Sequence, residues 1–273
     1  MRVIESVDAA SSIMQGDILE FPENFERPFE CQSAIVLTAD CDLAQEKHYG
    51  QILLCPIVPI SSYLRGAWSR RKLSKMSSTA FKKLLEELPK IPGLKGSGDV
   101  SEEAIASLAA SEEIMSRALD EIADVPSVLK NKILKLVKIF AACQRNQPDP
   151  LRDLVNAVSV RDDIDESKAS SKVFGEFRQE MKGDNLEAVV IAEEASGSNM
   201  ACVVLLRCPF LISSSEIRVD WNESGRVRRS GTFAAPLKYL IAQKFGNLFS
   251  RFGMPLVVEA DRDAAVDMEE LIL

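Results

Sequence analysis

The chain has 273 residues, of which 46% are hydrophobic and 27% are charged, and its formal net charge is −8. This length and apolar content allow one large domain or two small ones with a substantial core, and they exclude long-range disorder. No apolar run approaches the roughly 20 residues of a membrane-spanning helix. The acidic beginning lacks the apolar core of a signal peptide. We therefore expect a soluble, cytoplasmic protein with no membrane partner.

Charged residues are arranged in blocks along the chain. Residues 65–90 and 126–152 are mostly basic, whereas residues 91–125 and those from 259 onward are mostly acidic. The net acidity disfavours a general nucleic-acid coat but allows a local basic patch. The six cysteines contain no CxxC pair, so we expect reduced thiols, no metal and no cofactor.

The first region, residues 13–60, has the pattern of β structure. Gly16-Asp17 is a turn signal before an apolar run at 18–21, and two further β-rich runs follow at 33–38 and 51–58. Pro56 and Pro59 predict that the last of these strands ends at, or runs along, a sheet edge.

The middle of the chain, about 61–182, is predicted to be mostly helical, with Pro148 and Pro150 flanking a turn. Apolar residues at helical spacing predict helices over 78–88, over 101–119 with a break, from Pro126 to about 140, and over 165–182.

The last third returns to β structure and closes with a helix. Two apolar runs at 186–192 and 200–206 flank Ser196-Gly197-Ser198-Asn199, which predicts a hairpin. Residues 216–221 alternate as a strand does, and an amphipathic helix is predicted from Pro236 to Gly253. Neither β region can close a core alone. We predict an α+β fold, in which residues 1–60 and 184–273 form one discontinuous β-rich domain with a C-terminal helix, interrupted by an α-helical insertion at 61–183. Two domains side by side are the alternative.

The most unusual local cluster is Thr38-Ala39-Asp40-Cys41-Asp42, followed by His48, the single histidine of the chain. A Cys41–His48 pair would make a thiolate nucleophile, with Asp40 or Asp42 orienting the imidazole. Alternatively, the aspartates cap backbone groups at a strand end and the thiol is packed. A weaker alternative is that Asp17, Asp40, Asp42 and His48 gather a divalent cation.

A second cluster is basic. Its predicted nucleic-acid-binding residues are Arg226, Arg228, Arg229 and Lys238, and Trp221, Phe233 and Tyr239 lie among them. Basic residues with interleaved aromatics suit single-stranded nucleic acid, because bases stack and phosphates need positive charge. The alternative is that these arginines pair with the acidic tail and the aromatics pack inward.

Over residues 13–60 the chain resembles the PemK/MazF-like growth-inhibitor family. The resemblance rests on Gly16-Asp17-Ile18-Leu19, Arg27-Pro28, Ile35-Val36-Leu37-Thr38 and Leu54-Cys55-Pro56-Ile57. It implies a small SH3-like barrel built from N- and C-terminal strands, and it implies that Arg27 and Thr38 match the residues that serve RNA cleavage in the toxins.

Three functions remain open at this point. The first is a prokaryotic barrel protein that binds nucleic acid or protein in a toxin–antitoxin, mobile-element or phage-defence setting, or that cleaves RNA through Arg27 and Thr38. The second is a cysteine hydrolase that uses Cys41 and His48. The third is a non-enzymatic adaptor with a protein partner docked on the helical insertion. We place a binding module slightly ahead of an enzyme.

Overall fold

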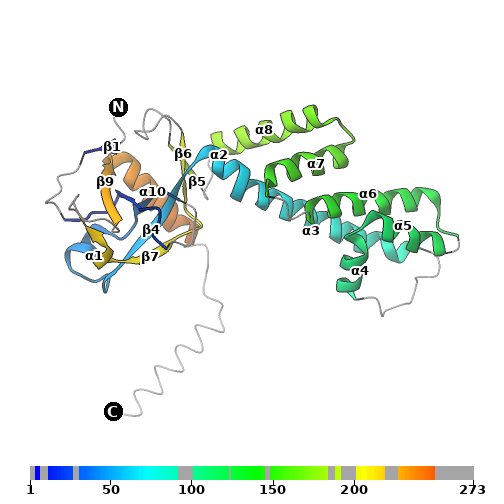
Figure 1. Cartoon of the computed structure of the whole chain (residues 1–273), viewed down its shortest axis with the longest axis horizontal. Coiled ribbons are helices and arrows are strands. Elements are labelled where there is room, and N and C mark those ends of the chain that lie inside the picture. Colours follow the sequence, from blue (N-terminus) through cyan, green and yellow to red (C-terminus); the bar gives the residue numbers. More distant parts are fainter. Residues whose placement is uncertain are drawn as a thin grey trace, which may run out of the picture. The chain divides into compact units, whose positions relative to one another are not determined.

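The computed structural model describes most of the chain and divides it into two compact units. The β unit comprises Met1–Pro59 and Asn185–Leu273, and the helical unit comprises Ile60–Asp184. The residues described are 4–6, 12–26, 31–91, 101–122, 124–144, 148–183, 188–191, 201–218 and 227–249. Together they form a mixed α+β fold (Figure 1).

The β unit is built on a curled, half-barrel sheet that is antiparallel except for one short strand. Its order is β1-β9-β2-β3-β4-β6-β5, with β7 also paired to β4 and β8 parallel to β9. The register between β2 and β9 shifts between Ile18 and Leu19. Such a bulge increases local twist and helps a sheet to curl. The strands are β1 (Ile4–Glu5), β2 (Asp17–Glu20), β3 (Ser33–Val36), β4 (Gln51–Pro59), β5 (Ala188–Ile191), β6 (Cys202–Leu205), β7 (Phe210–Ser213), β8 (Ile217–Arg218) and β9 (Val227–Phe233).

The core of the β unit lies between the sheet and the helix α10 (Ala235–Phe249), which Figure 1 draws against the strands. Ile241 and Leu248 of α10 are buried in one cluster with Ile18, Ile35 and Phe233 of the strands. These two helix positions are seven apart and therefore share one face. Helix α10 therefore contributes to the core of the β unit.

Two details of the sheet differ from the sequence-based expectation. Strand β4 is not at an edge, because it pairs with β3 on one side and with β7 and then β6 on the other. Pro56 lies where β4 changes partner, since β7 ends opposite Leu54 and β6 begins opposite Ile57. No strand was predicted over β9, where the sequence indicated only a basic cluster, although the burial of its residues alternates along its whole length.

The helical unit begins with α2 (Ile60–Tyr63), a π-helical turn (Leu64–Trp68) and α3 (Ser69–Glu87), which a 3₁₀ turn (Leu88–Lys90) ends. It continues with α4 (Glu102–Ala109), α5 (Glu112–Glu121), α6 (Ser127–Gln144), α7 (Pro150–Asp162) and α8 (Glu166–Lys182). Ile133, Leu136, Val137 and Phe140 of α6 supply the central face of its core, as their spacing predicts. Helix α7 was missed, because Pro150 is its first residue rather than part of a turn.

Side-chain caps explain where several of these helices begin. Ser101, Ser111 and Asp165 each accept a hydrogen bond from a backbone N–H in the first turn of α4, α5 and α8. Acidic residues follow in the same turns, where the helix dipole favours negative charge. The break between α4 and α5 that the sequence suggests is confirmed at Ala110 and Ser111.

Candidate functional site

The first candidate site lies at the end of β3, where the sequence places Thr38. The Leu37 N–H donates to the Leu53 carbonyl at 2.8 Å, and the Leu53 N–H donates in turn to Thr38 Oγ1 at 2.8 Å. The hydroxyl therefore replaces a backbone acceptor and extends the β3–β4 ladder. Its partner in the ribonuclease hypothesis, Arg27, lies outside the described residues, so that hypothesis stays a prediction.

Asp40, in the short helix α1 (Asp40–Ala44), ties this strand end to its surroundings. Its Oδ1 accepts the Gln15 N–H at 2.6 Å, and its Oδ2 lies 3.6 Å from Lys238 Nζ of α10. Gln15 Nε2 donates to the Leu37 carbonyl at 3.0 Å. Asp40 thus holds the loop before β2, as the sequence-based alternative of a backbone-capping aspartate describes.

Gly16 is the close-packed centre of this arrangement. Its φ is 92°, which disfavours any residue with a side chain, and a Cβ atom there would lie 2.7 Å from the Cβ of Lys238. Its N–H donates to the Val36 carbonyl, and its carbonyl accepts the Phe233 N–H, each at 2.9 Å. The turn signal at Gly16-Asp17 therefore marks a junction of β2, β3, β9 and α10.

Cys41 directly follows Asp40 in α1, and it is not hydrogen-bonded to His48. The exposed Cys41 Sγ lies 3.6 Å from Asp42 Oδ1, and His48 Nδ1 accepts the Gly50 N–H at 3.1 Å. No hydrogen bond or ion pair joins Cys41 to His48 in the described part of the chain. The nucleophile–base contact that the hydrolase hypothesis needs is therefore not formed here, and the hypothesis stays a prediction.

Alkylation with iodoacetamide distinguishes the thiol of Cys41 from those of Cys55 and Cys143. Burial raises the pKa of Cys55 to about 12 and that of Cys143 to about 11, so both stay protonated and shielded near neutral pH. We expect the exposed Cys41 to be labelled first, and the His48→Ala variant to leave that rate unchanged. Mass spectrometry of tryptic peptides measures both, and a slower reaction at Cys41 in the variant would instead show that His48 activates the thiol.

The basic residues of the second sequence cluster are held by carboxylates. Arg229 is bidentate to Asp17, with Nε 2.7 Å from Oδ2 and Nη2 3.0 Å from Oδ1, and the side chains are 3% and 0% exposed. Arg228 pairs with Glu20 on the neighbouring strand, and Lys238 pairs with Asp40. Arg226 lies outside the described residues. Acidic residues of the N-terminal segment thus form ion pairs with the three described members of the basic cluster. The nucleic-acid-binding role of this cluster stays a prediction.

The proposed cation site at Asp17, Asp40, Asp42 and His48 is wrong. Asp17 is enclosed with Arg229, whereas Asp40 faces Gln15 and Lys238. In the ranges that the structure describes, no group of three or more His, Cys, Asp and Glu side chains is placed to hold a metal ion.

No helix in the described part of the chain combines the length and the apolar character needed to cross a membrane.

The second candidate site is a cleft of about 310 Å³ in the helical unit, which we call the basic groove. Its size falls at the lower end of the range of ligand-binding pockets. Four helices contribute to it. The lining residues are Lys72, Lys75, Met76, Thr79, Ala80 and Lys83 of α3, Leu136 and Ile139 of α6, Leu154, Val158 and Arg161 of α7, and Val173 and Glu176 of α8.

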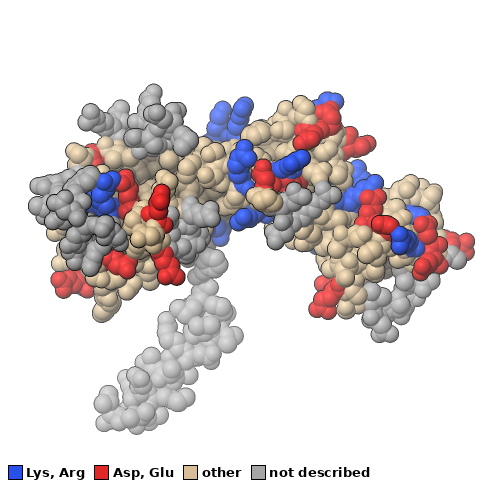
Figure 2. Space-filling view, viewed as in Figure 1, with Lys and Arg blue, Asp and Glu red and all other residues tan. Residues whose placement is uncertain are grey.

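The floor of the basic groove is aliphatic and its rim is cationic. Floor residues such as Ile139, Leu154 and Val173 are buried. Lys75 and Lys83 on the rim are exposed and form no ion pair with any described residue. Figure 2 shows basic side chains over the part of the unit around α2 and the beginning of α3, and a mixture of acidic and basic side chains over the end that holds α4 and α5. At that end the acidic block at 91–125 and the basic block at 126–152 meet, since Lys130 pairs with Asp120 and Lys138 with Glu112.

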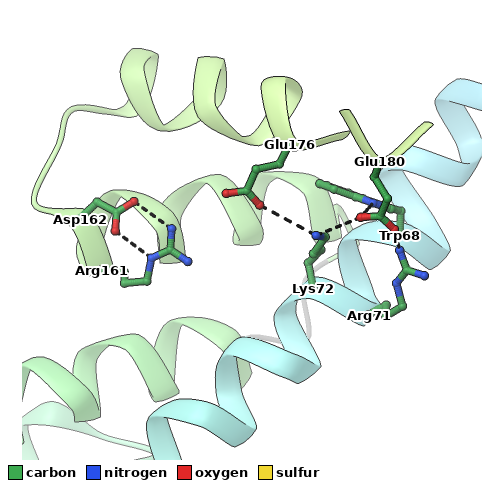
Figure 3. Close-up of polar contacts among 7 residues, drawn as sticks. All are labelled: Trp68, Arg71, Lys72, Arg161, Asp162, Glu176 and Glu180. Atoms are coloured by element: carbon green, nitrogen blue, oxygen red, sulfur yellow. Dashed lines mark hydrogen bonds and ion pairs between the residues drawn. The ribbon is translucent and has the colours of Figure 1, made fainter. Parts of the chain in front are cut away.

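The remaining rim charges are fixed by local ion pairs (Figure 3). Lys72 Nζ lies 3.0 Å from Glu180 Oε2 and 4.0 Å from Glu176 Oε2, and Glu180 also accepts from Arg71 and from Trp68 Nε1 at 3.0 Å. Burial raises the pKa of Glu180, but Lys72, Trp68 and Arg71 outweigh it and the net shift is downward. Glu180 therefore stays ionised and holds Arg71 and Lys72 at the beginning of α3.

Arg161 closes the other side of the groove. It donates through Nε and Nη2 to Asp162 at 2.8 and 2.9 Å, and Lys172 reaches the same carboxylate at 2.8 Å. The hydrogen bonds from Arg161, with a smaller contribution from Lys172, hold the pKa of Asp162 well below its ordinary value. The basic block at 65–90 was the one sequence signal for this site, since Lys72, Lys75, Thr79 and Lys83 recur at helical spacing along α3.

Comparison with known proteins returned no relative. The chain matches no protein-family model, and neither a curated protein nor a solved structure matches it.

Proposed function

We propose that the chain is a protein-binding module whose helical unit takes a partner in the basic groove. The observation that carries this proposal is an aliphatic floor bordered by Lys75 and Lys83, two exposed cations that no described carboxylate neutralises. Protein–protein interfaces have an apolar centre within a polar, charged rim, and this cleft combines an aliphatic floor with a charged rim. The positive rim selects a partner of negative charge.

A protein suits this groove better than a nucleic acid does. None of the described residues that line it is aromatic, so the groove offers no surface on which bases would stack. Phosphates would engage Lys75 and Lys83 but would leave the aliphatic floor unused. Apolar side chains of a protein segment fill that floor, and its carboxylates meet the lysines.

The β unit belongs to the same proposal as the scaffold that displays the binding module. We keep the PemK/MazF-like relationship of residues 13–60, with an SH3-like barrel as its expected fold and a cytoplasmic toxin–antitoxin or phage-defence setting as its expected context. The curled antiparallel sheet is the kind of scaffold that this relationship requires. Catalysis is not part of the proposal, because Thr38 and Asp40 are engaged in structural hydrogen bonds.

Site-specific photo-cross-linking in the cells that make the protein tests this function. A photoreactive residue replaces Lys83, which lines the groove, and in a matched variant it replaces Lys82, which is exposed on the same helix but does not line it. We expect one protein to be captured from position 83 and not from position 82. Thr79→Trp fills the groove and should abolish capture, whereas the neighbouring exposed Ser78→Trp should preserve it.

Capture that is equal from positions 82 and 83, or that survives Thr79→Trp, would refute the groove as the binding site. Cross-links to RNA or DNA from position 83 would likewise replace the protein-binding function with a nucleic-acid one. Thr79 and Ser78 are both exposed, so neither substitution should prevent folding, and circular dichroism of both variants verifies this.

A further inference from the structure

The dimensions and charges of the basic groove also define what occupies it. We infer that its occupant is an acidic amphipathic α-helix of about three turns, an inference that rests on the proposed function. Such a helix places one apolar stripe on the floor and carboxylates against the rim. This is the helix-in-groove mode of peptide recognition, in which anchors recur at i, i+3 or i+4, and i+7.

The length of the groove comes from α3. Its lining residues on α3 run from Lys72 to Lys83 and include Met76, Thr79 and Ala80. At about 1.5 Å per residue, this stretch is about 17 Å long, which is about three helical turns. An extended peptide of that length would present side chains to two opposite faces, whereas a helix presents all its apolar side chains to one floor.

The floor has the width that a helical stripe needs. It is shared by three helices beside α3: Leu136 and Ile139 come from α6, Leu154 and Val158 from α7, and Val173 from α8. All five side chains are less than a tenth exposed and are aliphatic. A floor without hydrogen-bonding groups fits leucine, isoleucine, valine or methionine, and it gives no partner to a polar side chain.

The rim determines where the negative charge of the occupant lies. Lys72 is shared between Glu176 and Glu180, and Arg161 is held by Asp162, so the local carboxylates already engage these two cations. Lys75 and Lys83 have no such partner among the described residues. They are eight residues apart on α3, about 12 Å. The occupant therefore carries acidic residues about two turns apart on the side facing α3.

A synthetic helix tests this inference with the full-length protein. The probe is a lactam-bridged peptide of about three turns, with leucine at i, i+4 and i+7 and glutamate at the exposed positions, because an unbridged helix this short is marginal in water. Fluorescence anisotropy should show saturable binding that weakens with added salt. A peptide of the same composition with the leucines spread around the helix should bind at least about tenfold more weakly, since it buries less apolar area.

Charge-reversed proteins locate the binding on the rim. The Lys75→Glu/Lys83→Glu variant should weaken the acidic peptide at least about tenfold, because two attractive contacts become repulsive. The matched Arg70→Glu/Lys82→Glu variant changes net charge equally, at two exposed α3 residues outside the groove, and should bind within about twofold of the unmodified protein. Equal weakening by both variants would overturn the inference, because it would reflect net charge alone.

Three other outcomes would also overturn it. They are equal binding of the dispersed peptide, equal binding of a peptide with lysine in place of glutamate, and displacement of the acidic peptide by oligouridylate. These failures are distinguishable from failure of the proposed function. If a protein is captured at position 83 but the acidic peptide does not bind, the protein-binding function stands and the helical occupant is refuted. If no protein is captured at position 83, both the function and the helical occupant are refuted.

Discussion

Replacing Arg229 with methionine is expected to lower the free energy of unfolding of the β unit by about 3–5 kcal/mol, because it leaves a buried carboxylate without its cation. Asp17 is fully buried and Arg229 nearly so, and the pair joins β2 to β9. Arg229 Nη1 also donates to the Ser12 carbonyl at 3.1 Å. Hydrogen exchange of the β2 and β9 amides measures the loss locally.

The matched control is Arg228→Met on the same strand. Its partner Glu20 and its own side chain are both partly exposed, so this change should cost no more than about 1 kcal/mol. The double variant Asp17→Asn/Arg229→Met should recover part of the lost free energy of unfolding. It removes the buried carboxylate charge but keeps an acceptor for the Met14 N–H. Equal costs for the Arg228 and Arg229 variants would contradict the structural role of the buried pair.

The Arg229→Met variant should also respond to pH. Burial already raises the pKa of Asp17 above its ordinary value of about 3.8, against the lowering effects of the Met14 N–H and Arg229. Without the guanidinium of Arg229, the pKa of Asp17 should rise further. A carboxyl whose folded-state pKa is raised favours folding below its unfolded pKa, and this advantage is lost as pH rises through the folded value. The variant should therefore be closest to the unmodified protein in stability near pH 3 to 4 and furthest from it near neutrality.

Truncating Trp68 to alanine is expected to destabilise the helical unit by about 3–5 kcal/mol. Trp68 is 1% exposed, packs edge-on against Phe177 of α8 with ring centroids 5.1 Å apart, and donates Nε1 to Glu180. Its removal leaves a cavity between the π-helical turn that precedes α3 and helix α8, and it removes one of the hydrogen bonds that hold Glu180. Hydrogen exchange should show lost protection in α3 and α8, with the amides of β4 in the β unit as an internal reference.

Trp68→Phe separates packing from hydrogen bonding. It keeps an aromatic ring against Phe177 but removes the donor to Glu180, whose other partners Lys72 and Arg71 remain. We expect a loss of about 1–2 kcal/mol, mostly from the unmet hydrogen bond. If alanine and phenylalanine cost the same, the apolar packing of Trp68 between the π-helical turn and α8 would not be its main contribution.

Local patterns predicted most of the regular structure. The apolar runs beginning at Ile18, Ser33 and Gln51 became β2, β3 and β4, and Ser101 and Asp165 cap the helices that follow them. Strands β5 and β6 pair antiparallel, as the predicted hairpin requires, and its predicted turn at 196–199 lies outside the described residues. These elements depend on side-chain periodicity and capping, which act between neighbours in the sequence. Strand β9 and helix α7 were missed, because glycine, arginine and proline signals masked them.

The candidate sites were far less predictable. The residues of the Thr38–Asp42 cluster were found, but their roles follow from distant partners: Leu53 for Thr38, and Gln15 and Lys238 for Asp40. One sequence-based alternative paired the arginines near residue 228 with the acidic tail, which lies outside the described residues, and the structure pairs Arg228 and Arg229 with Glu20 and Asp17, which the sequence did not indicate. Sequence distance is a poor guide to ion pairs once strands from the two halves of the chain lie side by side.

The sequence by itself determined an α+β protein with β structure near both ends, helices between, and charge in blocks, because hydrophobic period and composition act locally. Only the tertiary structure decided which charges are neutralised. Asp17 and Glu20 take up Arg229 and Arg228, while Lys75 and Lys83 remain unpaired among the described residues beside an aliphatic floor from four helices. The energy of a charge depends on its burial and its nearest opposite charge, and both are set by packing between segments far apart in the chain.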